Sequence, residues 1–495
     1  MEDTLPMEFS VPESILQPLL IAANSSRLDE ALECLLEAAR TAHGRSDLAS
    51  HNILLVGLQL SQLLSNSSAP HLLALSLRLL RNLCAGEIVN QNSFINENGV
   101  KIILLALKSV GLGSNPDYGI FRIGLQVLGN VSLAGEEHRS AIWGQFFPVW
   151  FVEIASIRRP EISDALSMVL YNCCNGSHER IGELCGIQGL PIVAEIIRTA
   201  STVGFREDWL KLLLSRVFFE DNHFPQLFSK LSSAQSTIIG GDVDHGDSLF
   251  TAAEVFLLST LSEVLNQKIE EIIVSNDFAF CVLEILRRSV VVIDSCSRGK
   301  SGLPTGFATI DVLGYSITIL RDICAREDMR SSKEENSVDV VSTLLSSGLI
   351  ELMLDLLRDL EPPAIIRKSI KKVETQEGPS SSDSPKVCPY KGFRRDIVAV
   401  IGNCLYRRKY VQDLIRKNNG ILLLMQQCVT DEDNPFLREW GIWSIRNLLE
   451  GNAENQRVVA ELELQGSVDI PEISGLGLRV EVDQKTRRAK LVNVS

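Results

Sequence analysis

The stretch SLRLLRNLCAGEIVNQ, residues 76–91, decides the fold, because its pattern returns along the chain. The pattern consists of an apolar helix, an Asn, a few further apolar residues and a polar turn. Clear copies are GLQVLGNVSLAGEEHR at 124–139 and WSIRNLLEGNAENQR at 443–457. We call the Asn, or the residue that replaces it, the anchor. The anchors are Asn82, Asn130, Asn172, Arg216, Thr260, Asp322, Asn403 and Asn447.

The spacing of the anchors identifies the repeat class. Successive anchors are 48, 42, 44, 44, 62, 81 and 44 residues apart. The common value is that of HEAT and armadillo repeats, about 40–47 residues, and the two long intervals indicate insertions. After each anchor come a polar turn, a second apolar stretch and a third helix. The sequence therefore predicts an all-α, armadillo/HEAT-like α-solenoid of about eight or nine helical repeats.

Composition shifts divide the chain into five segments. We expect an N-terminal segment at 1–25, armadillo-like repeats at 26–360, a Ser/Pro-rich linker at 361–390, a C-terminal armadillo domain at 391–465 and a tail at 466–495. The tail alternates apolar and polar residues, which is typical of a short hairpin or an extended arm.

Two local signals predict helix ends. Gly99 and Gly420 follow apolar stretches and are expected in the left-handed conformation just past a helix. Asp433 or Asn434 is expected to cap a helix whose first position is Pro435.

Composition also limits the partners and the compartment. The 495 residues carry a net charge of −14, which argues against nucleic acid as the main partner. The longest apolar runs fall far short of the roughly 20 residues that a membrane span needs, so we expect no membrane insertion. The start of the chain has no secretory pattern, and the eleven cysteines are scattered and odd in number. These features predict a cytoplasmic protein with reduced, mostly buried cysteines.

No motif predicts catalysis, a cofactor or a metal site. SRGKSG at 297–302 resembles a phosphate-binding loop but has Asp294 where the first Gly is required. DVDHGD at 242–247 resembles the start of a calcium loop but lacks its later ligands. We therefore expect a protein that is not an enzyme. A nucleotide-binding enzyme that uses the 294–302 loop is kept as a second alternative.

The asparagine anchors allow two interpretations. Each Asn could bond the turn of its own repeat, or the row could bind an extended peptide, as in importin-like or catenin-like receptors. Of these anchors, only Asn447 has a Trp four residues earlier, Trp443, as importin-like arrays repeat. The candidate protein-binding residues on this view are Asn82, Asn130, Asn172, Asn403, Trp443 and Asn447.

Two further surface features have a functional and a passive interpretation. Arg394, Arg395, Arg407, Arg408 and Lys409 lie within one repeat and form either a solvated face or a docking patch for an acidic or phosphorylated segment. Ser384 precedes Pro385 in the linker and is either a proline-directed phosphorylation site or part of a passive loop.

Residues 391–456 resemble the C-terminal domain of the ataxin-10 family. The resemblance rests on the step Ile401–Gly402–Asn403–Cys404 and on the series from Asp433 to Gln456, which contains NPF, EW and IRNL. It implies a cytoplasmic helical-repeat adaptor without catalytic residues. It also implies roles in cell division, cytokinesis and cell survival, protein partners that include kinases and signalling proteins, and self-association.

Overall fold

The computed structural model describes residues 27–66, 69–111, 117–220, 223–232, 249–268, 271–294, 296–325, 339–367, 385–462, 478–482 and 489–493. The chain divides into two compact units. Unit 1 comprises Met1–Ile285 and Gly306–Ile319, and unit 2 comprises Leu286–Thr305 and Leu320–Ser495. Calcium-loop candidate 242–247, Ser384 and segment 1–25 lie outside the described residues.

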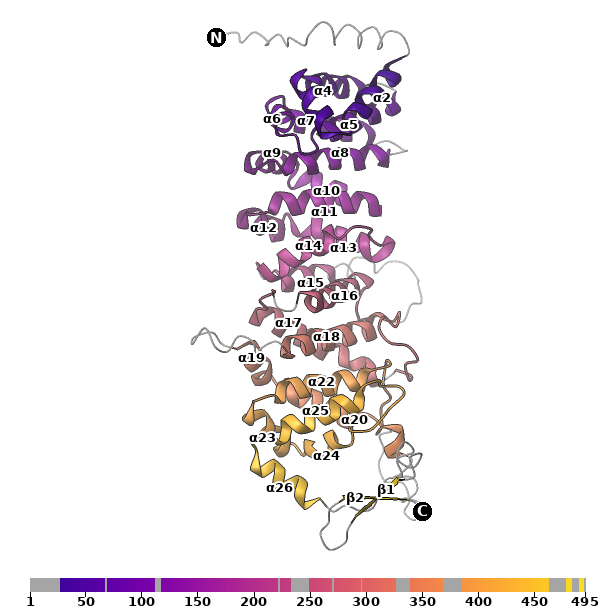
Figure 1. The fold of residues 1–495 in the computed structure, drawn as a ribbon, viewed down its shortest axis with the longest axis vertical. Helices are drawn as coiled ribbons and strands as arrows, with labels where there is room; N and C mark the ends of the chain where they lie inside the picture. Colours follow the sequence, from indigo (N-terminus) through magenta and orange to yellow (C-terminus); the bar gives the residue numbers. More distant parts are fainter. Residues whose placement is uncertain are drawn as a thin grey trace. The chain divides into compact units, whose positions relative to one another are not determined.

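The described part of unit 1 is built from helices that follow one another along the chain (Figure 1). They are α2 (Leu28–Ala38), α3 (Ala42–Ser50), α4 (Ile53–Leu64), α5 (Pro70–Leu83), α6 (Ile88–Asn96), α7 (Gly99–Gly111), α8 (Tyr118–Ser132), α9 (Glu136–Phe146), α10 (Val149–Ala155), α11 (Pro160–Cys174), α12 (His178–Cys185), α13 (Leu190–Val203), α14 (Trp209–Ser215), the π-helix η1 (Arg216–Glu220), α15 (Phe224–Ser232) and α16 (Ala252–Gln267). Most of α17 (Asn276–Ser289) and α18 (Ala308–Ala325) also belongs to unit 1.

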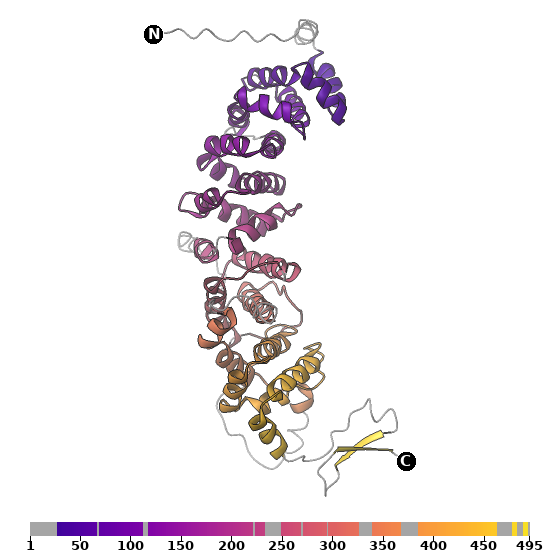
Figure 2. The ribbon, with the colours of Figure 1, turned by 60° about the vertical axis from the view of Figure 1, so that its left-hand side comes forward.

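Unit 2 combines helices with one strand pair. Its elements are the 3₁₀-helix η3 (Val290–Asp294), α19 (Val340–Ser346), α20 (Leu349–Asp359), α22 (Phe393–Leu405), α23 (Lys409–Lys417), α24 (Gly420–Met425), α25 (Leu437–Leu449), α26 (Ala453–Glu461), β1 (Leu478–Val482) and β2 (Ala489–Asn493). The strands pair antiparallel, with Val480 opposite Leu491, and are the yellow arrows of Figure 2. Of the two forms expected for the tail, the structure shows the hairpin.

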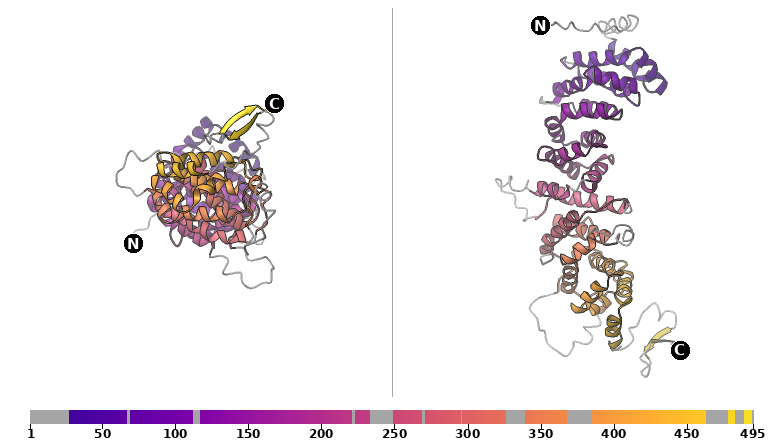
Figure 3. Two further views of the ribbon diagram at one scale, coloured as in Figure 1. Left: turned by 90° about the horizontal axis from the view of Figure 1, so that it is seen from below. Right: turned by 90° about the vertical axis from the view of Figure 1, so that its left-hand side faces the viewer.

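The eight anchors lie on or next to one helix of each repeat. These anchor helices are α5, α8, α11, α14 with η1, α16, α18, α22 and α25. Within unit 1, α11 packs between α8 and α14, and in unit 2, α22 packs against α25. The turned views show the unit 1 helices stacked in chain order (Figure 3). The fold class predicted from the spacing is confirmed: the chain is an all-α, armadillo/HEAT-like α-solenoid.

Burial on several sides explains the leucine-rich sequence. From Ile162 to Leu170 every residue of α11 except Met168 is buried, which is expected for a helix between two neighbours. Local polar signals set where helices begin. Asp117 accepts hydrogen bonds from the N–H groups of Gly119 and Ile120 at the start of α8, and Thr251 and Glu254 form a capping box on α16.

The predicted role of Gly99 and Gly420 is wrong. The left-handed residues are the preceding asparagines, Asn98 (φ 56°) and Asn419 (φ 55°), and each Gly opens the next helix. Asn adopts this conformation more readily than most residues. The glycines are needed for close approach instead, because a Cβ on Gly99 would lie 2.7 Å from the Phe94 ring.

The predicted start of the last anchor helix is also wrong. Helix α25 begins at Leu437, after Phe436 in the left-handed conformation, and no side chain caps it. Asn434 instead caps α22, since its Oδ1 accepts from the backbone N–H of Arg394 at 3.0 Å and of Arg395 at 3.4 Å. Asn434 Nδ2 donates to a carboxyl oxygen of Asp431 at 3.2 Å, which orients the amide so that its oxygen faces α22. Sequence position alone could not reveal a cap for another helix.

Candidate functional site

The anchor asparagines of unit 1 tie each repeat to the one before it. Asn130 Nδ2 donates to the carbonyl of Arg81 at 2.8 Å. Asn172 Nδ2 donates to the carbonyl of Gly129 at 3.4 Å and to Ser132 Oγ at 3.1 Å. In both cases the acceptor carbonyl belongs to the residue directly before the preceding anchor.

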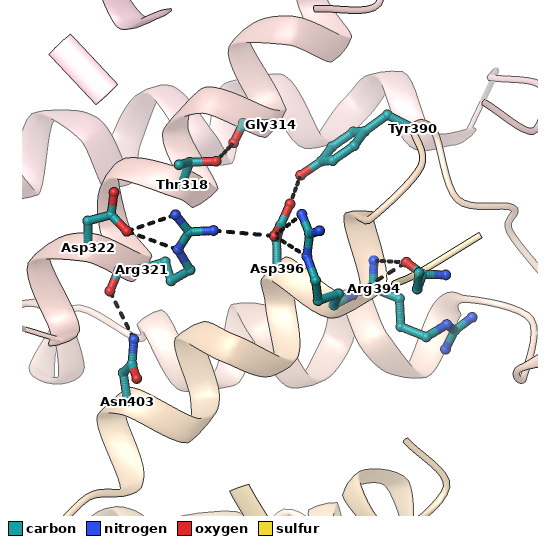
Figure 4. A network of polar contacts seen from close by, with 10 residues as sticks. Gly314, Thr318, Arg321, Asp322, Tyr390, Arg394, Asp396 and Asn403 are labelled. Carbon is teal, nitrogen blue, oxygen red and sulfur yellow. Dashed lines mark hydrogen bonds and ion pairs between the residues drawn. The ribbon is translucent and has the colours of Figure 1, made fainter. Parts of the chain in front are cut away.

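Unit 2 repeats this register. Asn403 Nδ2 donates to the carbonyl of Arg321, the residue before the anchor Asp322, at 3.1 Å (Figure 4). Asn447 Nδ2 donates to the carbonyl of Gly402, the residue before Asn403, at 3.0 Å. We call these four bonds the anchor ladder. It differs from both interpretations of the sequence, because each Asn bonds a neighbouring repeat.

The anchor ladder limits which asparagines can contact a partner. Asn172 and Asn447 are buried, with 6% and 1% of their surface exposed. Asn82, Asn130 and Asn403 are half-buried. Asn82 has no earlier anchor, and its Oδ1 accepts from the Arg81 guanidinium. The structure thus leaves no continuous exposed row that includes Asn172 and Asn447.

Two glutamines, which we did not identify in the sequence, each join a repeat to the following one. Gln91 lies nine residues after its anchor, and its Nε2 donates to the carbonyls of Cys84 and Asn130, each at 2.9 Å. Gln412 lies nine residues after Asn403, and its Nε2 donates to the carbonyl of Asn447 at 2.7 Å. The shared signal in the sequence is a Gln nine residues after the anchor, at Gln91 after Asn82 and at Gln412 after Asn403.

Arg394 and Arg395 do not lie on an exposed basic patch. Arg394 is 2% exposed and donates to Gln427 Oε1 at 3.3 Å and to the carbonyl of Glu361. Arg395 is half-buried and pairs with the buried Asp396. Asp396 also accepts from the Tyr390 hydroxyl at 3.0 Å (Figure 4). Burial, with the Asp396 charge beside it, holds the pKa of Tyr390 well above its usual value.

The other members of the basic cluster lie past the end of α22. Arg407 and Lys409 are exposed, whereas Arg408 is half-buried and donates to the carbonyl of Asn403 at 3.3 Å. The cluster is therefore split along the length of α22. Its first two members stabilise the interior of unit 2, and Arg407 and Lys409 remain at the surface.

An exposed row of rings and guanidinium groups lies over α22 and α25. The rings of Tyr406 and Trp443 are nearly parallel, with centroids 6.5 Å apart. Arg407 lies over the Tyr406 ring at 5.0 Å and Arg446 over the Trp443 ring at 5.3 Å. Trp443 is 39% exposed. We call these four residues the aromatic row.

Comparison with known proteins shows a similarity to ataxin-10. The domain described as "Spinocerebellar ataxia type 10 protein domain" matches residues 393–492, from α22 to β2. Ataxin-10 from Homo sapiens is 26% identical over 437 residues, which covers 88% of this chain and 85% of that protein. An ataxin-10 homolog from Dictyostelium discoideum is 37% identical over 94 residues, 19% of this chain and 15% of its own.

Over most of its length the chain is similar to ataxin-10, and residues 393–492 match the domain of that family.

The similarity to ataxin-10 extends through both units, while the family domain lies within unit 2. The family domain contains the aromatic row and the ladder bond from Asn447 to the carbonyl of Gly402. A solved structure titled for a phosphorylation switch in the interaction between cadherin and beta-catenin covers 89% of this chain and 76% of its own, at 13% identity and a TM-score of 0.38. The fold class follows instead from the order of the helices and the way in which they pack.

The nucleotide alternative finds no support in the structure of its loop. Residues 296–302 follow the 3₁₀-helix η3 rather than a strand. The Gly299 N–H donates to the carbonyl of Cys388 at 3.0 Å, and Arg298 pairs with Glu361 and Asp433. The backbone N–H of Gly299 and the Arg298 charge, which a phosphate would need, thus have other partners.

The remaining expectations concern metals, cysteines and membranes. Within the described ranges, no three His, Cys, Asp or Glu side chains are grouped to hold a metal ion. Most of the eleven cysteines are buried, as predicted, and none of them forms a disulfide within the described residues. Of the helices described, none alone is long and apolar enough to cross a membrane, and only the bent pair α19 and α20 meets the criterion jointly.

Proposed function

We propose that this member of the ataxin-10 family is a non-catalytic scaffold that binds other proteins through the aromatic row. The observation that carries the proposal is the nearly parallel stacking of the half-buried Tyr406 and the exposed Trp443, with Arg407 over the first ring and Arg446 over the second. Trp, Tyr and Arg are the residues that most often dominate binding energy at protein interfaces. The anchor ladder beneath the row fixes the helices that present it.

The chemistry of the row favours a particular kind of partner. Two guanidinium groups flank two ring faces, so carboxylate or phosphate groups can pair at the flanks while an apolar side chain covers the rings. Ile442 lies next to Trp443 and is 52% exposed, which enlarges the apolar surface. We therefore propose an acidic or phosphorylated partner segment with at least one apolar side chain.

We extend the proposal to the cellular role that the family resemblance implies. On this view the protein acts in the cytoplasm, in cell division, cytokinesis or cell-survival signalling, with kinases or other signalling proteins among its partners, and it self-associates. Support for this extension is the family membership alone. The absence of catalytic activity is proposed on the same basis, together with the all-helical repeat fold.

The test compares proximity labelling by the full chain and by two variants. Trp443→Ala removes a ring of the row, and Ile187→Ala removes another large apolar side chain, which is 95% exposed, from unit 1. We expect Trp443→Ala to lose a defined set of labelled proteins and Ile187→Ala to keep it. Circular dichroism confirms that both variants are folded. The same labelled set in all three proteins contradicts the proposal.

A further inference from the structure

Unit 1 contains a small open cavity of about 40 Å³ on the surface of α8 and α11. The loop between α13 and α14 forms one side of it. The polar residues that line it are Arg122, Gln126, Glu161, Asp164, Arg206 and Glu207. Asp164 and Gln126 lie eight and four residues before the anchors of their own helices. Gln126 therefore has the same position relative to its anchor as Trp443 of the aromatic row.

Asp164 has an unsatisfied carboxylate oxygen in this cavity. The side chain is 4% exposed, and Oδ2 accepts from the backbone N–H of Arg206 at 3.0 Å. Oδ1 is buried and has no hydrogen-bond partner among the described residues. A buried carboxylate oxygen without a partner is costly. It is stabilised when a cationic donor reaches it.

The charges around Asp164 do not neutralise it. Glu161 and Glu207 add negative charge to the lining. Arg122 and Arg206 line the cavity too, but neither forms an ion pair with Asp164 within the part of the chain that is described. Burial above all, and then the charge of Glu207, raise the pKa of the Asp164 carboxyl. The backbone N–H groups of Arg206 and Glu207 and the charge of Arg206 lower it in part, but the net shift is upward. A bound cation would offset the free-energy cost of burying the Asp164 carboxylate.

We propose that this cavity binds the primary ammonium group of a lysine side chain from a partner protein, with Asp164 Oδ1 as its main acceptor. A cavity needs on the order of 10–15 Å³ to hold one water, so 40 Å³ accommodates an ammonium group with the methylene next to it. An ammonium carries three donors in a compact group, and the Glu161 carboxylate in the lining supplies a further acceptor. The inference rests on the proposed function only in that the ligand is a protein segment.

The test is a fluorescence anisotropy titration of the full chain with a labelled dodecapeptide of glycine and serine that contains three lysines. A matched peptide carries acetyl-lysine in their place, which removes the charge. Asp164→Asn keeps the size of the side chain and an oxygen for the Arg206 N–H. Glu179→Gln removes the same charge from an exposed residue of unit 1 outside the cavity lining.

We expect the lysine peptide to bind the wild type at least 10-fold more tightly than it binds Asp164→Asn. The acetyl-lysine peptide should bind the wild type at least 10-fold more weakly than the lysine peptide does. Glu179→Gln should change the affinity less than 2-fold. Asp164→Glu, which keeps the charge, should retain more binding than Asp164→Asn. Equal weakening by Asp164→Asn and Glu179→Gln, or no binding by the wild type, overturns the proposal. Trp443→Ala should bind the peptide as the wild type does, which separates this result from a failure of the aromatic row.

Discussion

Helices α11 and α25 form the same kind of anchor bond but carry different side chains at the positions before the anchor. Asn172 and Asn447 each donate to the carbonyl directly before the preceding anchor. Four and eight residues earlier, α11 has Met168 and the buried Asp164, whereas α25 has the exposed Trp443 and Glu439. The comparison teaches that one helix separates two tasks. The anchor stabilises the contact between repeats, whereas the positions before it differ between repeats and are the ones that we propose to bind ligands.

The largest effect is expected from Asn172→Asp. The substitution removes the amide donor and places a carboxylate against the Gly129 carbonyl in a buried site, which should lower the free energy of unfolding by about 3 kcal/mol or more. Urea denaturation measures it. Asn82→Asp is the matched control, because its oxygen already accepts from the Arg81 guanidinium, and its effect should stay below about 1 kcal/mol. Equal effects at both positions contradict the anchor ladder.

A smaller loss is expected from Gln412→Ala. This change leaves the carbonyl of Asn447 without its donor at 2.7 Å, and that of Glu450 without its donor at 3.1 Å. The expected destabilisation is about 1–3 kcal/mol, again measured by urea denaturation. Gln456→Ala removes an exposed bond to the carbonyl of Leu449 and should cost less than Gln412→Ala. The reverse order would show that Gln412 does not join the repeats.

The pH dependence of Asp164→Asn sharpens the contrast between the two helices. Because the folded-state pKa of Asp164 is raised, the folded protein binds more protons than the unfolded chain between the ordinary value, 3.8, and the raised one. This group therefore contributes a stability that falls as pH rises through that window. Thermal unfolding from pH 3.5 to 7 should show the variant gaining stability relative to the wild type as pH rises. A constant difference argues against a buried, unpaired carboxylate.

The smallest stability effect is expected from Trp443→Ala. Because the ring is 39% exposed and makes no ladder bond, the unfolding midpoint should change little. Thermal unfolding measures this, and Leu448→Ala, whose side chain is fully buried, is the contrast in the same helix. A similar loss in both variants would mean that Trp443 is a core residue.

The sequence predicted what depends on local periodicity. Anchor spacing predicted the repeat helices, because apolar residues at helical intervals must be buried whatever their neighbours are. It did not reveal that Asn434 caps α22, nor that Asn130 bonds Arg81, since these contacts join residues about 40 to 49 positions apart. Arg394 looked like a surface cation because its burial depends on Gln427 and Glu361, which come from other segments. The Asp164 cavity had no sequence signal, because a lone Asp in a helix is ordinarily exposed.

The most direct test of the separation of tasks measures unfolding and partner capture for Asn447→Ala and Trp443→Ala side by side. Capture uses a partner identified by proximity labelling, below the unfolding temperature of each variant. The account predicts that Asn447→Ala lowers the unfolding midpoint and keeps the partner, whereas Trp443→Ala keeps the midpoint and loses the partner. Loss of the partner by Asn447→Ala with an unchanged midpoint would contradict it, because that Asn would then bind the partner rather than the neighbouring repeat.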